Sequence, residues 1–271
     1  MSVNSSKPKT QRRGVLQRTV QEQTSDEAGS EKLDQIAEEV PVAFAYNGQS
    51  HAVMMASPLD LNDYAVGFSL TERIIDNVDD ILNIEVLEAK QGFTVQLHIK
   101  PHLVERLDKQ RRQLSGRSGC GICGISDLAA AIPQLEPVTK TTKPSHAIIA
   151  AALEEFQSKQ SMQQECGAVH CAALFNAQGV LLELKEDIGR HNALDKVIGA
   201  RTKVSAIKVS DFVVMSSRAS HELITKTVIA GAGTIVAVSA ATSLAIDIAE
   251  QLNLNLVGFV RGERQVVYHQ N

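Results

Sequence analysis

The sequence predicts an α/β protein, with a three-layer α/β/α domain in its carboxyl-terminal half and a smaller α+β part before it. Three short apolar runs, at 212–215, 234–238 and 254–259, are typical of strands buried on both faces. A polar loop and a helical pattern follow each of the first two runs, and such repeats form parallel β-α-β units. A chain of 271 residues, 44% of them hydrophobic, has room for one large domain or two modest ones.

A proline-rich stretch marks the expected boundary between the two parts. Residues 133–144 contain three prolines among polar residues, a composition typical of a linker or a surface crossing. We therefore expect the α+β part over residues 33–143 and the α/β/α domain over residues 144–271. Residues 1–32 carry few large apolar side chains and cannot bury enough surface to fold, so we expect a disordered tail there.

The amino-terminal part opens with a predicted hairpin and a helix. Asn47-Gly48, the preferred dipeptide of a type I′ turn, separates apolar strands at 42–46 and 51–55. A helix follows, with Ser57 as the expected N-cap and Pro58 at its first position, and it runs to about residue 72.

The rest of this part leads to a pair of cysteines. Residues 84–88 and 93–99 are expected to form a second hairpin, since the latter alternate apolar and polar side chains. Residues 103–114 predict a helix with a basic surface. A glycine-rich loop, S-G-R-S-G-C-G-I-C-G, and a short helix from Ser126 come next.

The carboxyl-terminal domain is expected to begin with a helix over 145–160. Residues 168–175 and 180–186 predict two paired strands around the turn N-A-Q-G. A helix then starts near Arg190. Two more helices, from His221 and up to about Leu252, accompany the three buried strands.

Composition excludes several classes of function. The net charge of −4 gives no reason to expect DNA, RNA or an anionic membrane as partner. Aromatic residues amount to 4%, too few for a platform that stacks single-stranded bases. Charged residues interrupt every apolar run before it could span a bilayer. The twin arginines at 12 and 13 lack the apolar stretch of an export signal, and four cysteines suit a reducing compartment.

Cys120 and Cys123 are the first candidates for chemistry. Four glycines surround them, and six basic residues against two acidic ones lie between Lys100 and Arg117. Nearby positive charge stabilises a thiolate, and glycine lets the backbone approach a partner closely. The loop is therefore suited to meeting a sulfur atom held by another protein.

Three other roles remain open for this pair. It could form half of a zinc site with two ligands drawn from Cys166, His170 and Cys171, or act as a redox dithiol, or be inert. A zinc deaminase is disfavoured because no histidine has Glu two residues later and no Pro precedes the C-x-x-C. Cys166 and Cys171 are expected to be small core residues.

A second candidate site is the segment E-D-I-G-R-H-N-A-L-D-K. Asp187 lies just before a predicted helix and has two open roles, as a helix cap or as a ligand contact. His191 and Asp195 are four residues apart, so they share a helix face with Arg190 nearby. A carboxylate beside a histidine orients the ring or raises its pKa. Such a polar helix start predicts a contact with an anion or a cofactor.

The loops after the buried strands form a third candidate site. Ligands of open α/β sheets bind at the carboxyl edge of the strands, where free helix N–H groups hold phosphate. Ser217 and Arg218 lie in the first loop, S-S-R-A-S, and the second loop is S-A-A-T-S. With V-R-G-E-R after the third strand, the loops predict a nucleotide-like anion site. The glycine and lysine motifs of common NAD and ATP sites are absent from the sequence.

Seven segments together resemble one family, the formate dehydrogenase accessory sulfurtransferases, or FdhD family. The resemblance runs from about Leu33 to Tyr268 and is specific because the motifs are long and in order. They are E-E-V-P-V-A-F-A-Y-N-G, M-M-A-S-P-L-D-L, G-F-S-L-T-E-R-I-I, R-S-G-C-G-I-C-G, K-E-D-I-G-R-H-N-A-L-D-K, S-S-R-A-S and L-V-G-F-V-R-G-E-R.

The resemblance implies a sulfur carrier that takes a persulfide from a cysteine desulfurase. It implies that Cys120 carries the persulfide, which Cys123 resolves or tunes. The sulfur goes to the bis-molybdopterin guanine dinucleotide molybdenum cofactor before that cofactor enters the formate dehydrogenase apoprotein. The implied cofactor-binding residues, read with the candidates above, are Phe259, Val260, Arg261, Gly262, Glu263, Arg264, Ser217, Arg218, Asp187, Arg190 and His191.

The resemblance also implies a cytoplasmic homodimer that binds a guanine nucleotide-type ligand, and a larger domain similar to the cytidine deaminase fold. Some relatives carry C-K-P-G-R where this chain has V-R-G-E-R, so the chain departs from them there and keeps the final Arg264. A zinc-stabilised chaperone that binds the cofactor without transferring sulfur is the alternative function.

Overall fold

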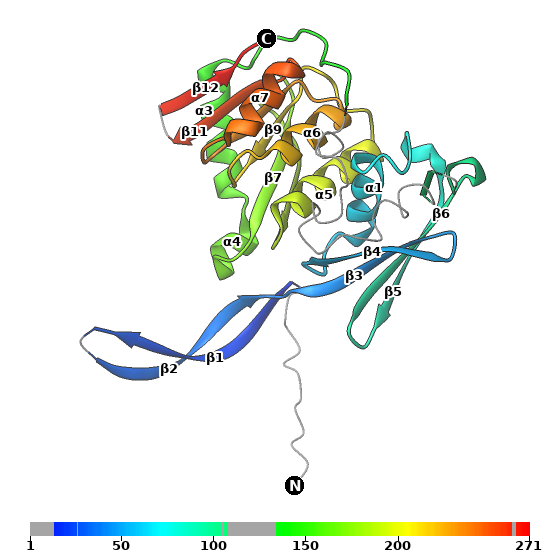
Figure 1. The fold of residues 1–271 in the computed structure, drawn as a ribbon. Coiled ribbons are helices and arrows are strands. Elements are labelled where there is room, and N and C mark those ends of the chain that lie inside the picture. The colour runs from blue at the N-terminus through cyan, green and yellow to red at the C-terminus, as the bar shows by residue number, and fades with distance from the viewer. Residues whose placement is uncertain (1–13, 26, 105, 108–133, 262–263) are drawn as a thin grey trace.

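The larger part of the molecule is a six-stranded mixed sheet with helices on both faces (Figure 1). The computed structural model describes residues 14–25, 27–104, 106–107, 134–261 and 264–271. The strand order is β12-β11-β10-β9-β7-β8. These strands are β7 (His170–Phe175), β8 (Leu181–Asp187), β9 (Phe212–Met215), β10 (Thr234–Ala237), β11 (Asn255–Arg261) and β12 (Arg264–His269).

The predicted α/β class is confirmed. The three buried runs are strands β9, β10 and β11, which pair in parallel, and β7 and β8 form the expected antiparallel pair. On one side of this parallel centre β12 pairs antiparallel with β11, and on the other side β7 pairs antiparallel with β9 and carries the edge strand β8. Strand β12 was not predicted from the sequence. The similarity to the cytidine deaminase fold stays a prediction.

Helices cover the two faces of this sheet as separate apolar layers. Helix α3 (His146–Ser158) packs Ile149, Leu153 and Phe156 on one face. Helices α5, α6 and α7 pack on the other face, with side chains such as Leu194 and Leu223 in a second cluster. Their bounds are Arg190–Thr202, His221–Ala230 and Ser243–Gln251. A short helix α4 (Ser161–Cys166), which was not predicted from the sequence, follows α3.

The predicted linker is an extended crossing over the carboxyl-terminal part. Residues 134–145 form neither helix nor strand. The amide of Val138 donates to the carbonyl of Leu252 at 2.8 Å, and the Asn255 side chain donates to the carbonyl of Thr141 at 3.3 Å. This segment is therefore fixed to the larger sheet rather than spanning between separate bodies.

The smaller part is a four-stranded sheet with one helix packed on it. The strand order is β4-β3-β6-β5, and both predicted hairpins are confirmed. Asn47 and Gly48 have φ values of +49° and +82°, as a type I′ turn requires. The elements are β3 (Val40–Tyr46), β4 (Gln49–Ala56), α1 (Leu61–Thr71), a 3-10 turn (Val78–Asp80), β5 (Ile81–Ala89), β6 (Gly92–Ile99) and a second 3-10 turn (Pro101–Leu103).

The predicted start of α1 is wrong by three residues. The helix begins at Leu61 after Asp60, whose backbone is left-handed at φ +54°. Ser57 does not cap it, because its backbone amide and hydroxyl bond Asp187 and the amide of Ile188 instead. A tertiary contact has replaced the local capping interaction that the Ser-Pro pair indicated.

Helix α1 joins the two parts by packing directly against α5. Two glycines make the close crossing possible. A Cβ atom on Gly67 would lie 1.8 Å from the carbonyl oxygen of Asp195, and one on Gly199 would lie 1.9 Å from that of Asp63. Any larger side chain at either position would separate the helices.

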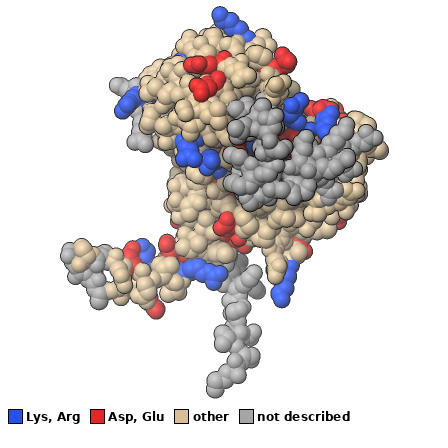
Figure 2. Space-filling model, in the orientation of Figure 1, with Lys and Arg blue, Asp and Glu red and all other residues tan. Residues whose placement is uncertain are grey.

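The expectation of a disordered tail over residues 1–32 is wrong from Val15 onward. Strands β1 (Val15–Thr24) and β2 (Glu27–Ala37) form an antiparallel ribbon, hereafter the arm, which extends away from the body (Figure 1). Cross-strand pairing compensates for the polar composition, and Lys32 and Glu22 form an ion pair at 2.8 Å. Figure 2 shows both signs of charge along it. Residues 1–13 lie outside the described residues.

Several other expectations fall outside the described residues. These are most of the basic helix at 103–114, the loop with Cys120 and Cys123, the short helix from Ser126, and Gly262 and Glu263. Within the described ranges, no helix has the length and apolar character needed to cross a bilayer.

Candidate functional site

Three loops meet at the carboxyl edge of the parallel strands, as the sequence predicted. Hydrogen bonds join them. The amide of Ala219 donates to Ala240 at 3.0 Å, the amide of Thr242 donates back to Ala219 at 3.1 Å, and the amide of Phe259 donates to Ser239 at 3.0 Å. We call residues 216–220, 238–242, 259–261 and 264 the rim. Backbone hydrogen bonds therefore hold the three loops of the rim together.

Three helices begin at this edge. The N-cap residues of α5, α6 and α7 are Gly189, Ser220 and Thr242. The Thr242 hydroxyl accepts from the amide of Ala245 at 3.3 Å. Ser220 has a buried hydroxyl without a hydrogen-bond partner among the described residues. Helix N-termini carry partial positive charge and unpaired N–H groups, so this edge favours an anion.

His191 pairs with a carboxylate, but not the predicted one. Its Nε2 lies 2.8 Å from a carboxylate oxygen of Glu222 on α6. The His191 interaction holds the pKa of Glu222 at about 2, below its ordinary value of 4.5. The expected partner Asp195 instead binds Lys226, one turn farther along α6. The pair therefore joins the first turns of α5 and α6 rather than two turns of one helix.

Asp195 belongs to a buried network between the two parts. Its two oxygens accept from the Lys226 ammonium at 3.0 and 2.9 Å, and one accepts from the Thr71 hydroxyl at 2.8 Å. Burial opposes a charged lysine here, yet the carboxylates of Asp195 and Glu72 raise the pKa of Lys226. Asp195 thus fixes α1 against α5 and α6 and does not reach the rim.

Asp187 is a structural carboxylate, which corrects its expected role as a cofactor contact. It is fully buried and pairs with the equally buried Lys196 at 2.6 Å. Its oxygens also accept from the amides of Ser57 and Gly189 and from the side chain of Asn192, at 3.0, 2.8 and 2.8 Å. Gly189, and not Asp187, is the N-cap of α5. A carboxylate with four donors inside the protein has no access to a ligand.

Arg190, His191 and His170 lie close together beside the rim. Burial lowers the pKa of His170, and the nearby charges of Arg190 and His191 lower it further. The Nε of Arg190 is buried and lacks a hydrogen-bond partner among the described residues. His170 lies 3.4 Å from the Ser216 hydroxyl, which also accepts from the amide of Cys171. These side chains are suited to a negatively charged group.

The turn after β11 supplies an aromatic side chain and a guanidinium. Phe259 has a φ of +50°, which turns the chain at the rim. The guanidinium of Arg264 lies 5.9 Å from the centre of the Phe259 ring. Val260 is fully buried among the α3-side core residues, so its expected cofactor contact is wrong. Arg261 pairs with Arg264 in the strand ladder.

Ser217 and Arg218 contribute differently to the first loop. The Ser217 hydroxyl donates to the carbonyl of Arg218 at 3.0 Å, and its side chain is buried. It therefore shapes the loop. Arg218 is exposed at the rim, where a guanidinium can bind phosphate oxygens.

The two cysteines that the structure describes lie in different surroundings. Cys171 lies in the apolar core, as expected, and burial raises its pKa. Cys166 is half-buried and its thiol donates to the carbonyl of Met162 at 3.1 Å. No cluster of three or more potential metal ligands occurs in the part of the chain that the structure describes. The Cys171 thiolate that zinc would require is disfavoured by its surroundings.

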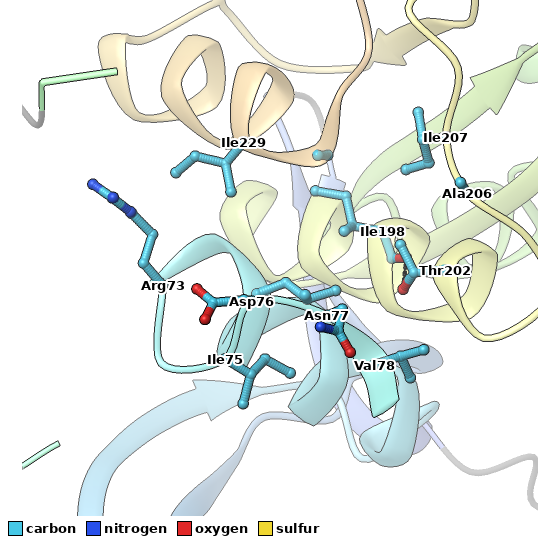
Figure 3. Close-up of a pocket in the computed structure, with 12 residues that line it drawn as sticks. Arg73, Ile75, Asp76, Asn77, Val78, Ile198, Thr202, Ala206, Ile207 and Ile229 are labelled. Carbon is cyan, nitrogen blue, oxygen red and sulfur yellow. Dashed lines mark hydrogen bonds between the residues drawn. The ribbon is translucent and has the colours of Figure 1, made fainter. Parts of the chain in front are cut away.

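A cavity of about 380 Å³ lies at the other ends of α5 and α6, away from the rim. Figure 3 shows Ile198, Ile207 and Ile229 around it, with Asp76 and Asn77 on the loop after α1. The lining contains none of the predicted site residues. The rim is therefore the candidate site.

The comparisons with known proteins all point to one family. The sequence model of the FdhD/NarQ family matches residues 37–271. Curated relatives named "Sulfur carrier protein FdhD" include one from Cupriavidus necator, 46% identical over 235 residues, which are 87% of this chain and 82% of the relative. The one from Xanthomonas euvesicatoria pv. vesicatoria is 42% identical over 258 residues, 95% and 91% of the two chains.

The fold is also that of a solved structure. A formate dehydrogenase accessory protein from Desulfotalea psychrophila superposes with a TM-score of 0.73 over 94% of this chain and 96% of its own, at 23% identity. The family match covers the four-stranded sheet, the rim and the segment with Cys120 and Cys123. The chain belongs to the FdhD/NarQ family.

Proposed function

We propose that this chain is a sulfur carrier that transfers sulfur from a cysteine desulfurase to the molybdenum cofactor of formate dehydrogenase. The observation that carries the proposal is family membership over residues 37–271, with curated sulfur carriers among the relatives. The rim supports it, because a dinucleotide cofactor needs an anion-binding edge.

The first step is a thiol exchange on Cys120. Its thiolate attacks the outer sulfur of the desulfurase persulfide, the S–S bond of the donor breaks, and the donor cysteine leaves as a thiolate. Cys120 then holds the persulfide. Basic residues before it in the sequence favour the thiolate that attacks. The chain is thus a sulfurtransferase with a covalent intermediate.

The second step requires two electrons, and Cys123 supplies them. The outer sulfur of a persulfide must be reduced to sulfide before it becomes a terminal ligand of molybdenum. The Cys123 thiolate attacks the Cys120 sulfur, a disulfide forms between the two residues, and the outer sulfur leaves as sulfide for the metal. A thiol reductant then restores the dithiol.

The bis-molybdopterin guanine dinucleotide cofactor is the substrate of this step and binds at the rim. Arg218 and Arg264 are cationic side chains of the rim, Arg190 lies beside it near His170, and α6 and α7 direct their N-termini toward it. Arginine binds phosphate oxygens through two parallel N–H donors. The Phe259 ring is an apolar surface beside Arg264 for the guanine end. The formate dehydrogenase apoprotein receives the cofactor, and we place these events in the cytoplasm.

The test is native mass spectrometry of the full chain before and after incubation with a cysteine desulfurase and free cysteine. Peptide mapping should find one added sulfur atom on the Cys120 peptide, removed by reductant. Cys120→Ala should lose this gain, whereas Cys166→Ala should keep it, because that thiol is bonded within α4. Sulfur on the Cys120→Ala chain would contradict the scheme. An unchanged mass with one retained zinc ion would support the cofactor chaperone instead.

A further inference from the structure

The cavity of about 380 Å³ lies between the two parts of the molecule and is separate from the rim (Figure 3). Its volume is within the roughly 300–1,000 Å³ that ligand pockets have. Ile75, from the loop after α1, and Ile198, from α5, line it and are almost fully buried. Half-buried apolar side chains complete the lining, namely Leu70, Val78, Ile207, Ile229 and Ala230. The interior is therefore suited to bulky apolar groups.

The charges at the mouth of the cavity offset one another. The exposed residues Arg73, Asp76 and Ala206 lie where the cavity opens to solvent. Helices α1, α5 and α6 end beside it, and the carbonyl ends of helices carry partial negative charge, which Arg73 offsets. Asp76 is neutralised by Arg106, which donates two hydrogen bonds of 2.7 and 3.1 Å to its carboxylate. An uncharged apolar occupant fits this balance better than an ion.

Arg106 connects the cavity to the segment that carries Cys120. Its guanidinium also donates to the carbonyl of Arg73 at 3.3 Å, so it fixes the loop that forms one side of the cavity. Residue 107 is the last described residue before that segment. The chain from 107 to 120 spans at most about 45 Å when fully extended, at roughly 3.3–3.6 Å per residue. A protein that delivers sulfur to Cys120 must therefore bring its sulfur atom within this distance of the cavity.

We propose that this cavity is the docking site for the sulfur donor, and that an uncharged segment of the donor inserts bulky apolar side chains into it. The inference rests on the proposed function, in which the donor is a cysteine desulfurase. Apolar anchors in a preformed pocket contribute most of the binding energy in many protein interfaces. Docking here places the donor beside the point where the segment with Cys120 begins.

The first test measures sulfur loading of the full chain against desulfurase concentration, with the added sulfur counted by mass spectrometry. Ile229→Asp places a charge in the cavity, and Ala206→Trp fills its exposed mouth. Each variant should raise the half-saturating desulfurase concentration at least about tenfold, as loss of a central anchor does. Val180→Asp is the matched control, because Val180 is 56% exposed and does not line the cavity. Half-saturating concentrations equal to that of the native chain in both cavity variants would overturn the proposal.

The second test loads the same variants from glutathione persulfide, a small donor that needs no docking site. The Cys120 thiolate attacks its outer sulfur, the S–S bond breaks, and glutathione leaves as a thiolate. We expect the native chain and all variants to load equally from this donor. Slow loading of Ala206→Trp from both donors would contradict a docking role. Since Ala206 is exposed, this variant decides the matter even where Ile229→Asp disturbs the fold.

The two donors also separate this inference from the proposed function. A native chain that accepts no sulfur from either donor would refute the proposed function, and the docking site with it. A native chain that loads normally, beside cavity variants that load equally well from the desulfurase, would refute the docking site alone. Unchanged loading with a lower midpoint of thermal unfolding in Ile229→Asp would assign the cavity a structural role instead.

Discussion

The ion pair of Asp187 and Lys196 is the most deeply buried charge pair described in the molecule. Both side chains are fully buried. Removing one partner of such a pair leaves an unpaired charge inside the protein. Asp187→Ala should therefore lower the free energy of unfolding by about 3–5 kcal/mol, measured by urea denaturation with circular dichroism. The exposed Asp247→Ala should change it by less than about 0.5 kcal/mol. A loss as small as that control in Asp187→Ala would contradict the structural role.

The pairing of Glu222 with His191 predicts that the stability of the fold depends on pH. The pKa of Glu222 is about 2 when folded, because of His191, and near 4.5 when unfolded. Its pairing therefore stabilises the fold above pH 4.5, and this contribution is lost as the pH falls from 4.5 toward 2. The stability difference between the native chain and Glu222→Gln should shrink over that window, in urea denaturation at a series of pH values. A difference that grows on acidification would refute the pairing.

Arg264 is the residue through which nucleotide binding at the rim can be tested. If it binds phosphate beside Phe259, Arg264→Ala should weaken binding of guanosine diphosphate by at least about tenfold, the effect of losing one charge-assisted pair. Isothermal titration calorimetry at fixed ionic strength measures this. Lys140→Ala, in the linker crossing away from the rim, is the control and should bind as the native chain does. Equal affinity of both variants would move the nucleotide site elsewhere.

At the scale of elements, the crossing of α1 and α5 depends on its two glycines. Gly199→Ala would place a methyl group 1.9 Å from the carbonyl oxygen of Asp63, which is backbone and cannot rotate away. We expect a loss of about 1–3 kcal/mol or more, seen as a lower midpoint in thermal unfolding. Glu154→Ala, on the exposed side of α3, should leave the midpoint nearly unchanged. An unaltered midpoint in Gly199→Ala would show that the helices separate without cost.

Local chemistry explains which elements could be predicted. Strand 212–215 was placed correctly because four apolar residues between polar loops fit a strand covered on both faces. The arm was missed because its polar side chains depend on cross-strand pairing between residues such as Arg18 and Asp34, which no local pattern encodes. The start of α1 was missed because Asp187, 130 positions away, engages Ser57.

In the candidate site, too, the features set by local sequence were predicted and those set by tertiary contacts were not. The three loops of the rim were predicted because parallel strands end at one edge. The partner of His191 was not, because helical spacing indicated Asp195, whereas Glu222 comes from another helix. Lys226 lies four residues after Glu222 and forms the ion pair with Asp195. That spacing is the one signal in the sequence that could have indicated the correct partner of Asp195.

For the whole molecule, shared buried polar groups predict a single unfolding transition. Asp187 bonds Ser57 of the smaller part, and Thr71 of α1 bonds Asp195 of the larger part. Neither part keeps its polar groups paired without the other, so both should unfold together. Circular dichroism and hydrogen exchange of the four-stranded sheet should give coincident transitions in urea. Earlier exchange of that sheet alone would show two independent domains.

The hydrogen bonds between Ala219, Ala240 and Thr242 have a kinetic consequence. Because these loops are tied to each other before any ligand arrives, the amino ends of α6 and α7 hold a fixed separation. A ligand at this edge has little backbone to order, so it retains more of its contact energy as affinity. Capture at the rim should then be a single-step encounter, limited by diffusion and charge rather than by rearrangement of the loops.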